Sequence, residues 1–334
     1  MATQTKPTSY DNALVAIYRG VKNTIFRGEA IGSLREDMRL EGGTALVTGA
    51  SSGLGFAIAV ELARRGVHVY GAARRAGPEI SAKLREASGT DRIEMLPLDL
   101  SDIHSIDGLL DALEARDRGL DLVVCNAALV PSGSQPGRQG IEQMFMVNYV
   151  AKQILIEGLR ARGLLVGSGS SPEGPRPRVV IVSSEAHRGA KLRRPETFDS
   201  YQDFTLGDVL ARYGTYKLAL TTFAQELARR LEPEGVAVHC LCPGAVHTNV
   251  AREAPEWSKP ALELVFKAFF QPPAKAAEPP LFLCLAPEIE ARTGVYLHQW
   301  VEKAPDERAL DPELGRAQWD ATAALIDQIR VRAM

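Results

Sequence analysis

The chain has 334 residues and a formal net charge of −2, with 45% hydrophobic and 24% charged residues. This balance is typical of a soluble globular protein with a large core, and the small net charge gives no reason to expect nucleic acid or an acidic surface as a partner. Four cysteines without zinc-like spacing to histidine predict buried free thiols rather than a metal site or a disulfide framework: Cys125, Cys240, Cys242 and Cys284.

Residues 1–40 precede the first clear strand and are predicted to form an N-terminal extension. Four apolar residues repeat there at helical spacing: Leu14, Ile17, Val21 and Ile25. We expect this helix to pack on the body of the fold or on a second subunit, and a helix lying on a membrane surface is the alternative. No apolar run approaches the roughly 20 residues of a membrane span, and no signal-peptide pattern opens the chain. Both observations favour a cytoplasmic protein.

Residues 41–330 are predicted to form one domain, because strand and helix patterns alternate there without a convincing linker. Six apolar runs indicate buried strands, at 45–48, 67–70, 93–98, 120–125, 179–182 and 236–241. Helical patterns lie between them, at 54–65, 103–116, 141–161 and 214–231. Buried strands separated by helices are typical of a parallel sheet covered on both faces. The predicted fold class is therefore α/β, with a doubly wound parallel sheet of the Rossmann type.

The first strand runs into a glycine-rich turn, TGASSGLG at 48–55, and a helix follows it. Small residues let the backbone approach a pyrophosphate, while the helix N-terminus offers unpaired N–H groups and the positive end of its dipole. A tight strand–helix turn without a ligand is the alternative. The residues expected to contact a dinucleotide here are Gly49, Ser51, Ser52, Gly53, Leu54 and Gly55.

The end of the second strand predicts which dinucleotide binds. An acidic residue there would hold a ribose 2′-hydroxyl, whereas a cation accommodates a 2′-phosphate. The sequence continues into Arg74 and Arg75, and no acidic residue follows until Glu79. Arg74, helped by Arg75 or Ser52, can clamp a phosphate, so we predict NADP(H) rather than NAD(H). A solvated pair of surface arginines is the alternative.

Two later strand ends complete the predicted cofactor site. Asp99 and Leu100 follow the third strand and are placed to meet the adenine edge, although Asp99 could instead be a helix N-cap. Asn126 and Ala127 follow the fourth strand, where the cofactor should cross the sheet.

Tyr213 and Lys217 lie four residues apart in a helical stretch and therefore share one face. The Lys217 ammonium can favour a phenolate and so lower a tyrosine pKa that is ordinarily about 10. Such a pair can pass a proton to or from a carbonyl oxygen. This spacing alone is common, but combined with the upstream glycine turn it indicates hydride transfer on a nicotinamide cofactor. Tyr216 has no lysine four residues later and is predicted to be a packing residue.

Over roughly residues 43–330 the chain resembles the short-chain dehydrogenase/reductase family. The motifs that carry the resemblance are the glycine-rich turn, Asp99, the Cys-Asn-Ala-Ala stretch at 125–128, the Ser183-Ser184 pair, the Tyr213 and Lys217 pair, and Pro243-Gly244. The chain looks most like the branch of retinol dehydrogenases and light-dependent protochlorophyllide reductases. That likeness rests on the long interval before Tyr213, the apolar segment 262–270 within an expected substrate lid at 250–280, and the tail at 293–296 followed by Trp319.

The resemblance implies a role for each matching residue. Tyr213 would donate or accept the proton, Lys217 would be its pKa partner and a ribose contact, and Ser184 would hydrogen-bond the reacting oxygen. Asn148 would complete a proton relay through a water. Four residues after the sixth strand would line the nicotinamide: Pro243, Gly244, Val246 and Thr248. Members of the family are often dimers or tetramers built on helix pairs, so we expect a homo-oligomer.

Three positions depart from the family pattern. Ala128 replaces the glycine of the usual Asn-Ala-Gly, and Tyr149 follows Asn148 in a stretch where the retinol branch has a glycine and aromatic residues. Ala245 stands where protochlorophyllide reductases carry a cysteine, which argues against the photochemical reaction. His187 lies near Ser184, but no G-x-S-x-G turn surrounds that serine, so a hydrolase triad is not predicted.

The function predicted from the sequence is an NADP(H)-dependent oxidoreductase that interconverts an alcohol and a carbonyl. The aromatic residues of segment 262–270 favour a small lipophilic substrate, and simple core packing of these residues is the alternative. Reduction of a C=C bond in a tetrapyrrole or another ring is a second candidate reaction. A nucleotide-binding regulatory protein with little turnover is a third candidate, although a complete set of acid/base residues speaks against it.

Overall fold

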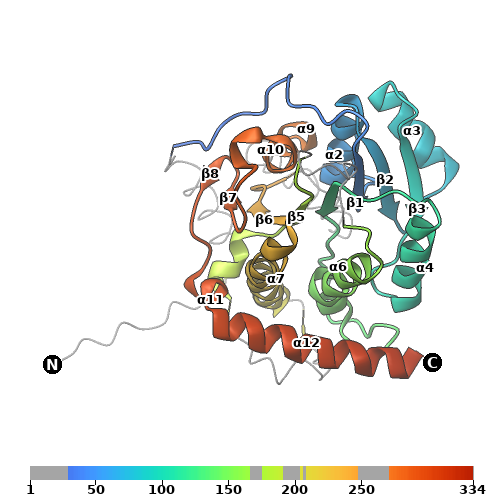
Figure 1. Ribbon diagram of the computed structural model, residues 1–334. Helices are drawn as coiled ribbons and strands as arrows, with labels where there is room; N and C mark the ends of the chain where they lie inside the picture. The colour runs from blue at the N-terminus through green and yellow to red at the C-terminus, as the bar shows by residue number, and fades with distance from the viewer. Residues whose placement is uncertain (1–28, 166–174, 191–203, 206–207, 247–270, 334) are drawn as a thin grey trace, which may run out of the picture.

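An eight-stranded sheet runs through the centre of the molecule, in the order β3-β2-β1-β4-β5-β6-β7-β8 (Figure 1). The computed structural model describes residues 29–165, 175–190, 204–205, 208–246 and 271–333. All neighbouring strands pair in parallel except β7 and β8, which pair antiparallel. The strands are β1 (Thr44–Thr48), β2 (His68–Ala73), β3 (Ile93–Pro97), β4 (Leu122–Cys125), β5 (Arg178–Val182), β6 (Ala237–Cys242), β7 (Tyr296–His298) and β8 (Val301–Glu302).

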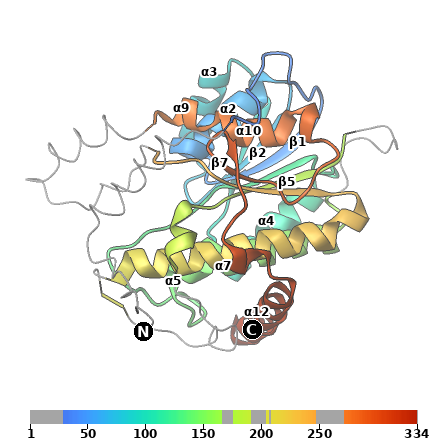
Figure 2. The ribbon, with the colours of Figure 1, turned by 90° about the vertical axis from the view of Figure 1, so that its left-hand side faces the viewer.

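Helices cover both faces of the sheet, because apolar strands buried on both sides need a helix layer on each. Figure 2 shows α2, α3, α9 and α10 on one side and α4, α5 and α7 on the other. The longer helices are α2 (Gly53–Arg64), α3 (Pro78–Ser88), α4 (Ile103–Glu114), α6 (Ala151–Ala161), α7 (Val209–Leu231), α10 (Glu278–Leu285) and α12 (Pro312–Ala333). The shorter ones are α5 (Gln143–Phe145), η1 (Met146–Val150), η2 (Glu185–Gly189), η5 (Glu232–Glu234), α9 (Pro273–Ala276), η8 (Pro287–Ile289) and α11 (Glu307–Leu310).

The strand order reverses between β1 and β4. The chain builds β1, β2 and β3 outward in one direction and then returns to pair β4 with β1, at Val47 and Val124 among others. In open α/β sheets, ligands bind outside the carboxyl ends of the strands at such a switch point. The doubly wound sheet predicted from the sequence is therefore confirmed. Its switch point places the expected ligand site at the carboxyl ends of β1 and β4.

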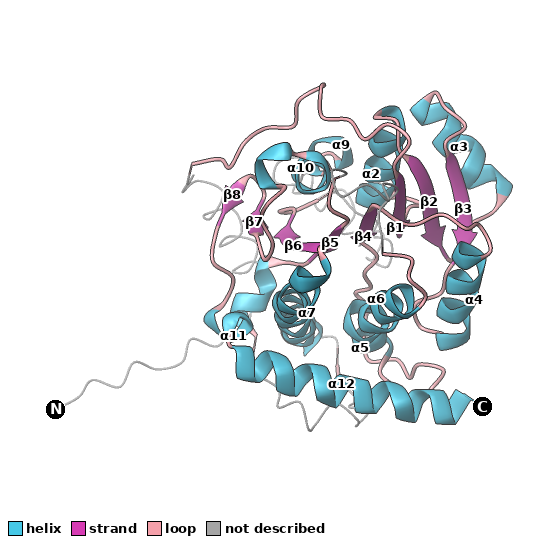
Figure 3. Cartoon of the chain, in the orientation of Figure 1, coloured by secondary structure: helices cyan, strands magenta, loops and turns pink. Residues whose placement is uncertain are grey.

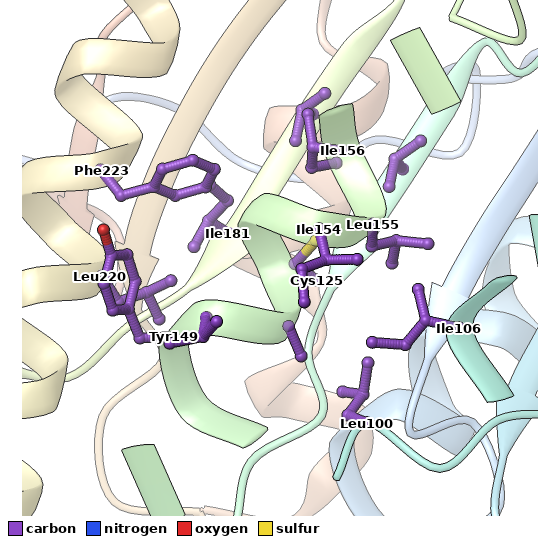
Figure 4. Packing of buried hydrophobic residues seen from close by; sticks show 14 of the residues in the cluster. Leu100, Ile106, Cys125, Tyr149, Ile154, Leu155, Ile156, Ile181, Leu220 and Phe223 are labelled. Atoms are coloured by element: carbon purple, nitrogen blue, oxygen red, sulfur yellow. The ribbon is translucent and has the colours of Figure 1, made fainter. Parts of the chain in front are cut away.

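One predicted helix is built differently from the expectation. The stretch 141–161 forms α5, the π-helical turn η1 and α6 in succession. Figure 4 shows Tyr149 of this π turn near Leu220 and Phe223 of α7, in the core on one face of the sheet. All four cysteines are buried free thiols, as predicted.

The described part of the N-terminal extension starts at the β8 edge of the sheet and then crosses the helix layer to the end of α2, where Arg65 donates to Arg35 O and Met38 O. Ile31 donates its backbone N–H to Trp300 O at 2.8 Å, and Ala30 forms a bridge with Val301. A Cβ on Gly32 would lie 2.7 Å from the Phe282 ring, so the segment also packs closely on α10. The helical stripe predicted between residues 14 and 25 lies outside the described residues.

The predicted lid 250–280 divides into two parts. Residues 271–280 contribute α9 and the start of α10, where Ala276, Ala277 and Pro280 are buried. Segment 262–270 lies outside the described residues. Among the described helices, none has the length and apolar character that crossing a bilayer requires.

Candidate active site

The glycine-rich turn brings the end of β1 very close to the start of α2. Gly49 has a φ of +74°, which favours glycine, and a Cβ on Gly55 would lie 2.4 Å from Gly49 O. Gly53 also has a positive φ, of +59°, but a Cβ there would meet nothing within 4 Å. The turn is thus closed toward the sheet and open at Gly53.

Within the described part of the chain, the Ser52 side chain does not cap α2. The first N–H groups of the helix therefore remain available to an anion at the open side of the turn. This arrangement fits the pyrophosphate of a dinucleotide, with Gly53 as the point of closest backbone approach. Leu54 is buried in the core, so only its main chain can face such a ligand.

The ends of β1 and β4 are tied together by a threonine that the sequence reasoning did not single out. Thr48 Oγ1 accepts hydrogen bonds from the N–H groups of Asn126 (3.0 Å) and Ala127 (3.1 Å). Asn126 Nδ2 in turn donates to Thr48 O at 2.9 Å. The position of Thr48 directly before the glycine turn is the sequence signal that could have identified it. These bonds hold Asn126 and Ala127 at the switch point.

Arg74 and Arg75 leave β2 at the same edge of the sheet. The register pairs Thr48 with Ala72, so Arg74 emerges close to the glycine turn. Both arginines and Ser52 are exposed. A ligand phosphate at this corner would therefore meet cations and a hydroxyl, as the sequence pattern indicates.

Asp99 is not the N-cap of the next helix. Its Oδ1 accepts from Ser101 N at 2.9 Å and from Ser101 Oγ at 2.6 Å, so it closes a short turn after β3. Asp102 is the N-cap of α4 and accepts from His104 N at 3.1 Å. The alternative that Asp99 caps the next helix is therefore wrong, because the N-cap lies three residues later. Leu100 is buried in the core, which leaves only its main chain for an adenine.

Ser184, Tyr213 and Lys217 meet beyond the end of β5. Ser184 begins η2, and its side chain hydrogen-bonds the Tyr213 side chain. Lys217 lies one turn further along α7, with its Nζ 5.6 Å from the centroid of the Tyr213 ring. A Cβ on Gly214 would lie 2.8 Å from Ala186 O, so a glycine beside Tyr213 allows α7 to approach η2 this closely.

Burial controls the proton affinities of this pair. It raises the pKa of the Tyr213 phenol to about 12, although the hydrogen bond with Ser184 opposes the rise. It lowers the pKa of the Lys217 ammonium to about 8. Lys217 Nζ donates to Val182 O at 2.9 Å. The expectation that Lys217 holds the phenol pKa below 10 is therefore wrong for this state, because desolvation dominates.

Asn148 lies in the π turn η1 and is fully buried. Its Oδ1 accepts from Leu129 N at 2.8 Å, and its Nδ2 donates to Leu129 O at 2.7 Å. The side chain therefore secures the loop after β4. The role of Asn148 in a water-mediated relay stays a prediction.

The Pro243-Gly244 turn follows β6 and contacts a residue that sequence reasoning missed. Gly244 has a φ of +82°, and a Cβ there would lie 2.3 Å from Gln299 Nε2. Gln299 N donates to Cys242 O at 2.8 Å, which fixes the β7–β8 turn against this motif. Val246 bridges Gln271 in parallel. Thr248 and His247 lie outside the described residues.

His187 does not form a triad with Ser184. Its Nδ1 lies 2.7 Å from the main-chain oxygen of Ser184, and its Nε2 accepts from Asp306 N at 3.1 Å. Both ring nitrogens thus hold main-chain groups. No cluster of metal-ligating side chains occurs in the part of the chain that the structure describes.

A cleft of about 1240 Å³ adjoins the glycine turn. It extends from Gly53 and Phe56 of α2 to Gln271, Gln299 and Trp300. The cleft thus adjoins Gly53 of the glycine turn and Gln299, the residue that Gly244 approaches, and its lining does not include Ser184, Tyr213 or Lys217.

Comparison with known proteins agrees with this geometry. A model of the short chain dehydrogenase family matches residues 43–190 and 200–259. The chain is 30% identical to retinol dehydrogenase 14 of Homo sapiens over 308 residues, which covers 87% of this chain and 88% of that protein. It is 31% identical to retinol dehydrogenase 13 of Mus musculus over 297 residues, with coverages of 86% and 84%.

A solved structure shares the fold. The Pseudomonas aeruginosa RhlG/NADP active-site complex has a TM-score of 0.61 at 25% identity, and the match covers 79% of this chain and 97% of that chain. The motifs, the sheet topology and these matches agree. The chain therefore belongs to the short-chain dehydrogenase family of nicotinamide-dependent oxidoreductases, in its retinol dehydrogenase-like branch.

Proposed function

We propose that the protein is an NADP(H)-dependent oxidoreductase that interconverts an alcohol and an aldehyde or ketone, with Tyr213 as the general acid/base. The observation that carries the proposal is the hydrogen-bonded pair of Ser184 and Tyr213, with Lys217 one turn away on α7. This group lies at the carboxyl edge of the sheet that also holds the open glycine turn.

Each of these residues has its own role in the proposed carbonyl reduction. A bound nicotinamide would supply the hydride to the carbonyl carbon. Tyr213 donates its phenolic proton to the carbonyl oxygen, and Ser184 donates a hydrogen bond to the same oxygen as negative charge develops there. Because the phenol pKa is about 12, Tyr213 carries this proton at neutral pH. Lys217, with a pKa of about 8, can return a proton to the phenolate afterwards.

The preference for NADP(H) is supported by Arg74. The residue is exposed at the end of β2, beside the glycine turn, with Arg75 next to it. A guanidinium offers paired donors to the 2′-phosphate, and no such interaction is available to the 2′-hydroxyl of NAD(H).

A lipophilic substrate is part of the proposal. The relatives include retinol dehydrogenases, whose names state a lipophilic alcohol as substrate. The apolar segment 262–270 lies in the sequence between Val246 and Gln271, and these two residues bridge each other shortly after the Pro243-Gly244 turn. We propose that this segment covers the substrate.

The experiment is NADPH oxidation against a panel of lipophilic aldehydes, ketones and ring-conjugated alkenes, in the dark and in light. Consumption with a carbonyl in the dark is the expected result. Consumption only with an alkene would instead support C=C reduction, and a light requirement would support the tetrapyrrole reaction. Tight NADPH binding with no consumption on any substrate would contradict the proposed carbonyl chemistry and favour a regulatory protein.

A further inference from the structure

Lys152 is a buried lysine beside the reaction site that the mechanism above does not use. It follows Asn148 by four residues, on the first turn of α6, and is only 2% exposed. Its Nζ donates to Ala127 O at 2.7 Å and also to Val147 O. One ammonium therefore joins the loop after β4 to the π turn that carries Asn148.

The two carbonyl groups belong to the loop after β4 and to the π turn η1. The proposed reaction requires a fixed distance between these two segments. Ala127 is held against β1 by Thr48, on the cofactor side. Val147 directly precedes Asn148, whose side chain holds Leu129 of the same loop. Lys152, on α6, adds a second link between the loop after β4 and the π turn through its bonds to Ala127 O and Val147 O.

A lysine in this position is costly to the fold. Burial lowers the pKa of the Lys152 ammonium to about 7, and the like charge of Lys217 on α7 lowers it further. Cys125 on β4 also faces it, but burial raises the pKa of that thiol to about 11, so the thiol is neutral near pH 7. A methionine would fill much of the same buried space without this cost.

We propose that Lys152 is a positioning residue of the reaction site, whose ammonium fixes the strand end that carries Asn126 and Ala127 against the turn that carries Asn148. This role rests on the proposed function, because the site that it positions is the one assigned there. When Lys152 loses its proton, the charge-assisted bonds to the two carbonyls weaken. The site is therefore held most firmly at a pH below about 7.

The first test compares Lys152→Met and Lys152→Arg with the unchanged protein, using exposed Lys83→Met as the control. In Lys152→Met, we expect kcat/KM for carbonyl reduction to fall about tenfold or more, since a displaced catalytic group can cost up to about 100-fold. The advantage of the unchanged protein should shrink as Lys152 loses its proton, so the ratio of its kcat/KM to that of Lys152→Met should fall between about pH 6 and 8. Lys152→Arg keeps the cation at every pH and should restore most of the activity.

The second test needs no turnover. The folded-state pKa of Lys152 lies below its unfolded value of 10.5, so protonation at low pH opposes folding. We therefore expect the free energy of unfolding of Lys152→Met, minus that of the unchanged protein, to be largest near pH 6. This difference should become smaller toward pH 10. NADPH binding should weaken several-fold in Lys152→Met, because Ala127 loses its support, and should not change in Lys83→Met.

The outcomes separate this proposal from the proposed function. If no substrate is turned over, the proposed function fails, and weaker NADPH binding in Lys152→Met would still support the positioning role. Unchanged NADPH binding in such an inactive protein would overturn it. In an active protein, a Lys152→Met variant with the pH profile and kcat/KM of the unchanged protein would overturn it as well.

Discussion

At the scale of single residues, the site depends on ionisable groups held away from water. Tyr213 keeps its proton to unusually high pH, while Lys217 and Lys152 lose theirs more easily than an exposed lysine does. In each case burial is the largest cause, because a low-dielectric environment disfavours the charged form of every group. A phenol that keeps its proton at neutral pH suits proton donation, which is the step that carbonyl reduction requires.

The raised phenol pKa predicts a difference between the two reaction directions. Reduction needs the Tyr213 phenol and oxidation needs its phenolate. With a pKa of about 12, the phenolate fraction rises tenfold for each pH unit below that value. We expect kcat/KM for alcohol oxidation to increase with pH across the alkaline range, while Tyr213 remains competent for reduction at neutral pH. Initial rates in both directions against pH check this, and an oxidation rate independent of pH would contradict it.

Arg74→Ala should separate the two nicotinamide cofactors. Loss of the guanidinium removes the proposed contact with the 2′-phosphate, so NADPH binding should weaken by about 10-fold to 100-fold. NADH binding should stay nearly constant. Arg92→Ala, at an exposed arginine before β3, is the matched control. Equal losses for the two cofactors, measured by calorimetric titration, would show that Arg74 does not bind the 2′-phosphate.

At the scale of elements, close backbone contacts position the side chains that we propose as catalytic. The approach of α7 to η2 depends on Gly214, since a Cβ there would lie 2.8 Å from Ala186 O. This contact sets the relation between Tyr213 and Ser184, which are carried by different elements.

Gly214→Ala should therefore lower both stability and turnover. We expect the free energy of unfolding to fall by about 1–3 kcal/mol, because η2 must move to accept the methyl group. Gly108→Ala is the matched control: Gly108 lies exposed in α4, and a Cβ there meets nothing within 4 Å. It should gain about 0.5–1 kcal/mol from helix propensity. Denaturant unfolding gives the change in the free energy of unfolding for each variant. Equal changes in the two variants would contradict the predicted clash of a Cβ at position 214 with Ala186 O.

The sequence pattern predicted the elements that have a strong period, and it failed where tertiary contacts decide. The first six strands follow from their apolar runs. The two-residue strand β8 has no readable period, and β7 is only three residues long. The π turn within 141–161 is invisible in the helical pattern, and so is the bond between its Asn148 and Leu129, which lie 19 residues apart in the sequence. The missed contribution of Lys152 has the same cause, since only the fold shows that its ammonium meets Ala127 O.

At the scale of the whole molecule, α12 runs across the helix layer on this face of the sheet and packs against α7 and α4 (Figure 3). Trp319 stacks on Phe223 with ring centroids 5.5 Å apart, and the Arg230 guanidinium lies 4.3 Å from the Trp319 ring centroid. Gln318 Nε2 donates to Tyr149 OH at 3.0 Å, next to Asn148. The C-terminal helix thus supports the π turn from behind.

The variant Trp319→Ala should show how much the packing of α12 contributes to the free energy of unfolding. Removing a buried indole from a packed core costs about 3–5 kcal/mol. Val331→Ala, at a residue of the same helix that is 73% exposed, should change stability by less than about 0.5 kcal/mol. Equilibrium unfolding in denaturant compares the two. A loss in Trp319→Ala as small as that in Val331→Ala would mean that α12 is not part of the cooperative fold.

The decisive experiment replaces the phenol alone. Tyr213→Phe should reduce kcat for carbonyl reduction by about 100-fold to 10,000-fold, the range typical of a lost general acid. Its affinity for NADPH should be nearly unchanged, because the ring and Lys217 remain. Tyr216→Phe, at a buried tyrosine of the same helix, should retain most of the activity. A Tyr213→Phe enzyme that keeps a substantial fraction of its turnover would contradict the assignment of Tyr213 as the proton donor.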